Sequence, residues 1–306
     1  MDYLSILNQM LSLFCIGVIG YVMYKVKILD DASTVRFTKL ILNITLPAQI
    51  VTSFMNSRGV ISNKTVFYVF GVTLLCYLIP ALIGAVFVLA ARAPKQQRGL
   101  YLFMHLFANV GFMGFPVIST IFGDEGMIYA VIFNVVFNVL VYSLGIVLIG
   151  NNRETVGFQP KLLLNIPFIA ALISIILFFT PIQFPSAVMN AFDYLGNVTT
   201  PVAMLILGCT IAAMPIKELF DDWRVYLFAA VRLAVVPLAV MMALKLIGVK
   251  DPLIAGVMIV LTAMPVATNT TMLAIEYGGD LQLASKGIFF TTILSVITIP
   301  MIAMVC

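Results

Sequence analysis

Charged residues are scarce in this sequence. Only 10% of its 306 residues carry charge, whereas 62% are apolar and the mean hydropathy is +1.12. A soluble domain has about a quarter charged residues and could not hide this much apolar surface in one core. The composition therefore excludes a soluble globular fold and predicts an integral membrane protein. The net charge of +4 is not gathered in a basic patch interleaved with aromatic residues, which argues against a nucleic-acid partner.

Side chains suited to catalysis or metal binding are scarce as well. The four cysteines are isolated, so neither a disulfide framework nor a CxxC metal site is indicated. His105 is the single histidine, there is no HExxH motif, and no aspartate or glutamate lies in the middle of an apolar run. An intramembrane enzyme would lack its catalytic groups, and a buried carboxylate relay for protons has no candidate. We therefore expect neither an enzyme nor a cofactor or metal site.

Long apolar runs dominate instead. A helix needs about 20 mostly apolar residues to cross the hydrocarbon of a bilayer. Ten runs come close to this length, at 6–24, 37–55, 66–91, 99–121, 127–149, 162–180, 190–213, 226–247, 253–275 and 286–305. The first lacks a basic segment before it and a small-residue cleavage site after it, so we interpret it as a retained span rather than a signal peptide. The sequence predicts an all-α polytopic protein with ten transmembrane helices.

Lysine and arginine fall unevenly on the two sides of these spans. One side carries twelve: Lys25, Lys27, Arg36, Lys39, Arg92, Lys95, Arg98, Arg153, Lys161, Lys217, Arg224 and Lys286. The other side carries four: Arg58, Lys64, Lys245 and Lys250. Because cytoplasmic loops are enriched in lysine and arginine, the first side is predicted to be cytoplasmic. Both termini are then extracytoplasmic in a multi-pass protein of the cell membrane.

A short motif occurs twice. Residues 43–48 read NITLPA, and residues 197–202 read NVTTPV, 154 residues later. A Gly-Asp pair closes the fourth and the ninth run at similar distances beyond, at Gly123 and Gly279. The chain then divides into two halves of five spans each, residues 1–155 and 156–306. An odd number of spans per half inserts the second copy upside down, so we predict the 5+5 inverted repeat of many secondary transporters.

The fourth and ninth spans show the strongest disturbance of the helical pattern. Each combines glycine or proline with polar residues near mid-membrane: Asn109, Gly111, Gly114 and Pro116 in the fourth, and Pro265, Thr268, Asn269, Thr270 and Thr271 in the ninth. Freed backbone groups are tolerated there only if protein or a wet cavity satisfies them, so both spans are predicted to be broken helices. An ordinary proline kink is the alternative for each span.

An anion is the expected ligand of two such breaks. A new half-helix beyond each break would begin with unpaired N–H groups and a partial positive charge. Asn109 and Asn269 can donate amide hydrogens to a carboxylate, while Thr268, Thr270 and Thr271 can either cap the second half-helix or offer oxygens to a cation. The predicted substrate site also includes Gly111, and the predicted helix-breaking residues are Gly114, Pro116 and Pro265.

The same residues carry a family resemblance that covers essentially the whole chain. The stretches LNITLPA, NVGFMGFPV, RLAVVP and AMPVATNTTMLAIEYGGD resemble the auxin efflux carrier family, which includes bacterial malonate-type transporters. The resemblance implies a scaffold of spans 1, 2, 6 and 7, a transport unit of spans 3, 4, 5, 8, 9 and 10, and an organic-anion site where the broken spans four and nine cross. By resemblance, Asn109 and Asn269 contact the substrate, and Pro47 and Pro201 face it from the scaffold.

The sequence departs from plant members of that family. Those have an Asn-Pro-Asn pattern at the breaks, whereas Asn109 is followed here by Val110 and Gly111, and Asn269 by two threonines. The long central cytoplasmic loop of many plant members is also missing. We therefore expect a compact microbial-type secondary carrier that moves a small mono- or dicarboxylate by alternating access, rather than an auxin carrier. A channel or a non-transporting membrane sensor with the same fold is the alternative.

Further polar residues have both a functional and a structural interpretation. Asn134 and Asn138 share a face of the fifth span and either line the cavity or bond between helices. His105, one turn before the first break, either titrates during transport or is a packed, hydrogen-bonded core residue. Arg232 either snorkels to the cytoplasmic surface or pairs with Glu276, as a latch or an anion guide. The coupling ion, H+ or Na+ if there is one, stays undecided.

The repeated motif itself is expected in the scaffold. Asn43, Pro47, Asn197, Thr199 and Pro201 are predicted to form a hinge or wall beside the site. Each proline frees a carbonyl one turn earlier, which the neighbouring asparagine and threonine side chains are expected to satisfy. The expected partners are the organic anion, the lipid bilayer and a second copy of the chain bound through the scaffold.

Overall fold

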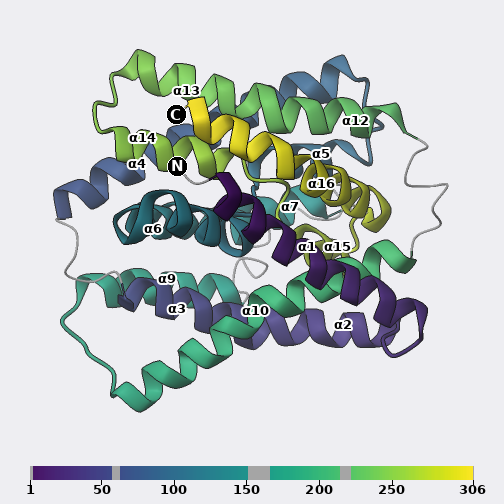
Figure 1. The fold of residues 1–306 in the computed structure, drawn as a ribbon, viewed down its shortest axis with the longest axis horizontal. Coiled ribbons are helices and arrows are strands. Elements are labelled where there is room, and N and C mark those ends of the chain that lie inside the picture. The colour runs from purple at the N-terminus through teal and green to yellow at the C-terminus, as the bar shows by residue number, and fades with distance from the viewer. Residues whose placement is uncertain (1–2, 57–62, 151–165, 214–221, 306) are drawn as a thin grey trace.

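The computed structural model describes residues 3–56, 63–150, 166–213 and 222–305 (Figure 1). Over these ranges the chain is helical and has no β-strand, apart from an isolated antiparallel bridge between Ala108 and Val266. The all-helical class predicted from the apolar runs is therefore confirmed.

The α-helices follow one another along the chain and are joined in places by π-helical turns, labelled η. The first part of the chain contains α1 Tyr3–Lys25, α2 Asp31–Leu40, η1 Ile41–Thr45, α3 Leu46–Asn56, α4 Asn63–Ala90, α5 Arg98–Leu106, η2 Val110–Gly114, α6 Phe115–Leu140, η3 Val141–Gly145 and α7 Ile146–Ile149. The second part contains α9 Ile166–Phe179, α10 Ser186–Ala213, α12 Trp223–Ala230, η4 Val231–Val235, α13 Val236–Ile247, α14 Pro252–Thr262, α15 Asn269–Tyr277 and α16 Leu281–Val305.

Long apolar helices bear out a multi-pass membrane protein. Within the described residues, five stretches are long and apolar enough to cross a membrane: Phe67–Ala90, Tyr129–Ile149, Ser186–Ala213, Trp223–Ile247 and Leu281–Val305. Shorter apolar helices cover Cys15–Lys25 and Pro252–Thr262. Because other predicted spans are divided between helices or only partly described, the count of ten stays a prediction.

One predicted linker is wrong. The sequence places a loop at Gly123–Gly126, but these residues lie inside α6, which is continuous from Phe115 to Leu140. The two glycines do not stop the helix, because glycine costs only about 1 kcal/mol in a helix interior, whereas proline costs about 3. No proline follows Pro116 in this helix, so the apolar residues on either side of the glycines keep it unbroken.

Three of the π-helical turns precede a proline by two residues. The turns η1, η2 and η4 come before Pro47, Pro116 and Pro237. In each turn the next N–H bonds to a carbonyl five residues back, as from Leu46 to Ile41. Proline lacks an N–H and its ring collides with the carbonyl four residues earlier, so a helix that is locally wider accommodates it. These prolines therefore widen their helices without ending them.

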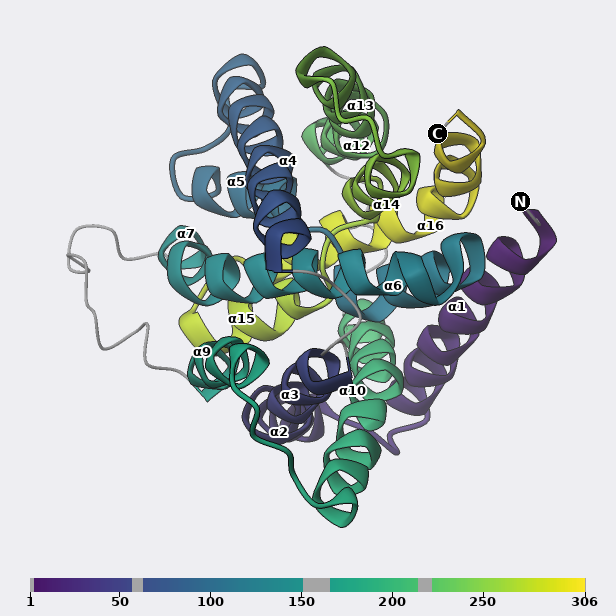
Figure 2. The same cartoon turned by 90° about the vertical axis from the view of Figure 1, so that its left-hand side faces the viewer.

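The helices form two groups, with α6, α7 and α15 between them (Figure 2). One group contains α1, α2, α3, α9 and α10, and the other contains α4, α5, α12, α13, α14 and α16. Within the first group α1 and α10 touch through their backbones, because a Cβ added at Gly208 would collide with the Gly17 carbonyl oxygen. Small residues allow such close packing between membrane helices. The core is centred between the groups, where residues 103–110 and 256–274 are all buried.

Candidate functional site

The break between α5 and η2 and the break between α14 and α15 pair with each other. The Asn109 N–H donates to the Pro265 carbonyl oxygen at 2.8 Å, and the Ala267 N–H donates to the Phe107 carbonyl oxygen at 3.0 Å. A buried backbone that leaves its helix must find partners elsewhere, since no water is available in the hydrocarbon region. Each break supplies those partners to the other, so two helices interrupted far apart in the sequence meet at one point.

Polar side chains at this meeting point are buried without partners. Asn109 is 1% exposed and Asn269 is 3% exposed. Among the described residues, neither amide atom of Asn109 has a hydrogen-bond partner, and the same holds for Asn269 Oδ1 and Thr268 Oγ1. A buried polar group left unpaired costs about 1–3 kcal/mol, so native proteins seldom keep several together without a use for them. These atoms also lie where η2 and α15 begin, and helix starts carry partial positive charge.

The threonines after the second break are used differently. Thr270 Oγ1 donates to the Ala267 carbonyl oxygen at 2.6 Å, and Thr271 Oγ1 donates to the Thr268 carbonyl oxygen at 3.0 Å. Both hydroxyl protons are therefore committed to the backbone. Thr268 precedes α15 without a side-chain capping bond, so its buried hydroxyl is the one available to a ligand.

The two asparagines of the fifth span also differ. Asn138 Nδ2 donates to the Asn134 carbonyl oxygen at 2.7 Å, a bond within one helix. Asn134 instead approaches the first break, because its Oδ1 lies 3.6 Å from the position that a Cβ on Gly111 would take. The structure thus brings Asn134 and Gly111 together beside Asn109, and it places Asn138 in a local structural bond.

The first break falls earlier than the glycine and proline that were predicted to cause it. Helix stops after Leu106 and resumes as η2 at Val110, before Gly114 and Pro116. Pro116 lies beyond the break, in the continuous helix of η2 and α6, where the π-helical turn accommodates it. Gly114 instead permits close packing, because a Cβ there would stand 2.8 Å from Leu261 Cδ2. The break is located by its hydrogen bonds to the other break rather than by these two residues.

Two residues at the site escaped the sequence analysis. Thr291 on α16 accepts a hydrogen bond from the Val266 N–H at 3.1 Å and donates to the Gly287 carbonyl oxygen at 2.7 Å. Tyr142 in η3 is 1% exposed and lies against the Asn269 side chain. The tenth span is rich in threonine and serine, which is a weak signal for Thr291. Nothing in the local pattern marks Tyr142.

Arg232 is buried beside the ends of both broken helices. It is 1% exposed, so it does not snorkel to the surface. Its Nε donates to the Met104 carbonyl oxygen at 3.1 Å and its Nη1 donates to the Thr262 carbonyl oxygen at 2.7 Å. Glu276 is exposed, and the ion pair found among the described residues joins Arg224 to Asp222, so the suggested pairing of Arg232 with Glu276 is wrong. Backbone carbonyls, which a sequence does not distinguish, take the place of the carboxylate.

His105 has the surroundings of a packed core residue. Its Nδ1 lies 2.8 Å from the Tyr101 carbonyl oxygen, and its ring centroid is 4.9 Å from that of Phe87 and 4.8 Å from that of Phe228. A neutral ring that donates from Nδ1 suits this apolar enclosure. The structure therefore favours the structural interpretation of His105 over a role in proton coupling.

The two copies of the repeated motif have matching surroundings. The asparagines Asn43 and Asn197 are exposed, the prolines Pro47 and Pro201 are partly buried, and the threonines Thr45 and Thr199 are buried. Neither threonine hydroxyl has a hydrogen-bond partner, so the expectation that these side chains satisfy a freed carbonyl is wrong for the threonines. In the first copy the π-helical turn η1 accommodates the proline instead.

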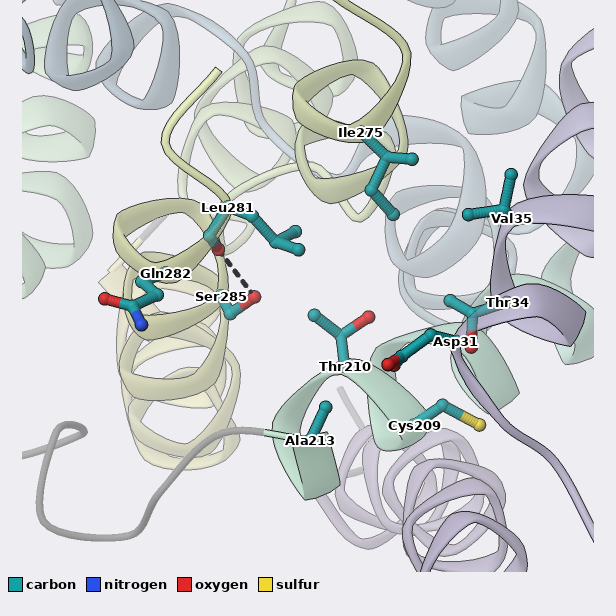
Figure 3. Close-up of a pocket in the computed structure, with 10 residues that line it drawn as sticks. All are labelled: Asp31, Thr34, Val35, Cys209, Thr210, Ala213, Ile275, Leu281, Gln282 and Ser285. Carbon is teal, nitrogen blue, oxygen red and sulfur yellow. Dashed lines mark hydrogen bonds between the residues drawn. The ribbon is translucent and has the colours of Figure 1, made fainter. Parts of the chain in front are cut away.

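A cavity of about 410 Å³ lies between the two groups of helices (Figure 3). Its wall includes Asp31 and Thr34 from α2, Thr210 from α10, Ile275 from α15 and Ser285 from α16. In Figure 3, Thr210 points into the space that separates α16 from α2. Ile275 belongs to α15, the helix that begins at Asn269, so one wall of this cavity lies on the helix that follows the second break.

The described residues form a helical membrane protein whose two helix breaks pair with each other and carry buried polar groups without hydrogen-bond partners. The family model for membrane transport proteins matches residues 5–161 and 155–303. The chain belongs to this family, which confirms the resemblance to the auxin efflux carriers that the motifs carry. It is a multi-pass transporter and not an enzyme.

Curated relatives extend over most of the chain. An uncharacterized transporter of Methanothermobacter thermautotrophicus is 25% identical over 98% of both chains. An uncharacterized transporter of Methanocaldococcus jannaschii is 23% identical over 96% of this chain and 97% of its own. A protein of Rhizobium meliloti named "Putative malonate transporter" is 25% identical over 73% of this chain and 72% of its own.

Proposed function

We propose that this protein is a secondary-active carrier for a small organic anion, a mono- or dicarboxylate, that binds where the two helix breaks meet. The observation that carries the proposal is the set of buried, unpartnered polar atoms on Asn109, Thr268 and Asn269. The Asn109 amide can donate to a carboxylate oxygen, and the starts of η2 and α15 add partial positive charge. A carboxylate could thus accept hydrogen bonds from the Asn109 Nδ2 and the Thr268 hydroxyl, two donors without a partner among the described residues.

Alternating access is the mechanism that we propose for transport. In it, the group of α1, α2, α3, α9 and α10 is the scaffold, and the remaining helices form the moving unit of a 5+5 inverted repeat. Two observations support this division: the backbone contact of α1 with α10 inside the scaffold, and the cavity between the two groups. The cavity lies on the cation-rich side, so we propose that it opens to the cytoplasm while both termini face outward in the cell membrane. The scaffold is also the surface proposed for a homodimer.

Ligand-dependent thermal stability tests the binding site. Purified protein is heated with malonate, which the name of the Rhizobium relative suggests, and with a series of mono- and dicarboxylates. We expect at least one anion to raise the melting temperature of the wild type and to leave an N109A/N269A variant unchanged. The matched control is N56A/N190A, because both of those asparagines are exposed on helices away from the breaks. An equal rise in N109A/N269A would contradict the proposed site.

Counterflow in proteoliposomes separates a carrier from its alternatives. Vesicles loaded with unlabelled anion should accumulate labelled anion transiently, because a carrier exchanges substrate across one alternating site. A channel would equilibrate the label without this overshoot, and a sensor would not move it. Imposing a proton or a sodium gradient on the same vesicles then tests the proposed coupling to H+ or Na+.

A further inference from the structure

Arg232 lies behind the proposed site rather than in it. It belongs to η4, and its buried guanidinium donates to Met104 O in the last turn of α5 and to Thr262 O, the last residue of α14. With 1% of its surface exposed, it is enclosed by protein. One side chain thus joins the ends of both half-helices that lead into the breaks.

The polarity of the four half-helices explains why a cation is needed there. Carbonyls at a helix C-terminus lack intrahelical partners and give that end a partial negative charge, whereas a helix start is partly positive. At the meeting point the negative ends of α5 and α14 face the same small region as the positive starts of η2 and α15. Without compensation the two pairs of charges would largely cancel, and the region would favour neither an anion nor a cation.

We infer that Arg232 sets the charge selectivity of the site by neutralising the carboxyl-terminal ends of α5 and α14, so that the positive starts of η2 and α15 dominate and an anion is preferred over its neutral analogue. This inference rests on the proposed anion transport. Arg232 acts as a positioning residue through the two helix ends and does not touch the substrate. Preorganised charge in a buried, water-poor site acts more strongly than it does in water.

The test compares an anion with an uncharged molecule of the same shape. Dissociation constants for malonate and for malonamide, its neutral diamide, are measured on wild type, R232Q and R232K, and their ratio gives the charge selectivity. R232Q keeps an amide donor but loses the charge, and we expect the ratio to fall by about tenfold. R232K keeps the charge on a head group without the guanidinium fork, and we expect the ratio to stay within about threefold of the wild type. A merely structural role would weaken both ligands equally and leave the ratio unchanged.

The control is R36Q, which removes an exposed positive charge from α2 and should not change the ratio. An unchanged ratio in R232Q would overturn the inference while leaving the proposed function standing, because malonate would still bind. If R232Q failed to fold, R232K would still test the inference, because a loss of selectivity despite the retained charge would overturn it. A wild type that bound no carboxylate would refute the proposed function itself, and the inference with it.

Discussion

Arg232 and Asn109 are equally buried, each with 1% of its surface exposed, but their surroundings are opposite. The Arg232 guanidinium donates to two carbonyl oxygens, whereas both amide atoms of Asn109 lack a partner. A buried polar group that is satisfied by the protein stabilises the fold, and one that is not satisfied weakens the fold until something binds it. The difference separates a residue that bonds to the ends of the broken helices from residues that, in the proposed function, bind the substrate.

The largest effect expected from this comparison is the loss of the satisfied group. Replacing Arg232 with methionine keeps a long apolar stem but leaves the Met104 and Thr262 carbonyl oxygens without their donor. Leaving a buried acceptor unsatisfied costs about 1–3 kcal/mol, and this substitution leaves two. We expect R232M to show the steepest fall in melting temperature of any variant described here, measured in detergent micelles by scanning fluorimetry. A melting temperature equal to that of wild type would mean that these carbonyls find other donors.

A substitution at Thr291 is also expected to destabilise the protein, but by less. Its hydroxyl accepts from the Val266 N–H, which lies in the second break. Valine has nearly the same shape, so T291V removes this acceptor without leaving a cavity. An unpaired buried N–H costs about 1–3 kcal/mol, and the same thermal assay should detect the loss. If T291V were as stable as wild type, Val266 would not depend on this bond and the pairing of the breaks would need no support from α16.

A substitution at Thr199 is expected to stabilise the protein rather than destabilise it. It is fully buried and its hydroxyl has no partner, as is also true of Thr45 in the first copy of the motif. Replacing Thr199 with valine removes an unsatisfied polar atom, so stability should rise by up to about 1 kcal/mol. The comparison with T291V is matched, because both variants make the same chemical change at a buried position. A destabilised T199V would show that this hydroxyl is satisfied in the native protein.

The sequence was sufficient to find the broken helices because their signals are local. Asn109 and Pro265 interrupt apolar runs within a few residues of where the structure leaves the helix. It was not sufficient to place the first break, because the break lies where the Asn109 N–H and the Phe107 carbonyl oxygen find partners in a segment more than 150 residues away. The loop predicted from the glycines of Gly123–Gly126 is wrong for a related reason: glycine often ends a helix, but here α6 continues through both glycines.

Hydrogen-bond partners that belong to the backbone cannot be identified from a sequence, for a different reason. The sequence predicts that Arg232 is a costly charge in the membrane. A carboxylate is its expected partner because carboxylates are acceptors that can be recognised from residue type. Every residue carries a carbonyl, so no pattern could single out Met104 and Thr262. The same applies to the Asn134 carbonyl oxygen that accepts from Asn138. A sequence therefore shows which side chains are polar, but it does not show which of them the backbone already satisfies.

The smallest effect on stability is expected at Asp30, because this residue has hydrogen-bond partners but is exposed to water. Its carboxylate accepts from the Ser33 hydroxyl at 2.6 Å and from the Ser33 N–H at 2.7 Å, which caps the start of α2. These two bonds lower the pKa of Asp30 below its ordinary value of 3.8. A lowered pKa contributes stability that is present above the ordinary value and is lost as the pH falls from there through the folded-state pKa.

We therefore expect D30A to lower the melting temperature by a few degrees at neutral pH, with the difference from wild type vanishing in acid. D30N is the matched control, because asparagine caps a helix without titrating, so it should be nearly as stable as wild type at neutral pH and lose less below the ordinary pKa. Melting curves of the three proteins at several pH values measure both effects. A difference between D30A and wild type that persisted unchanged in acid would show that the Asp30 side chain stabilises α2 equally well when it is neutral, so that its charge adds little.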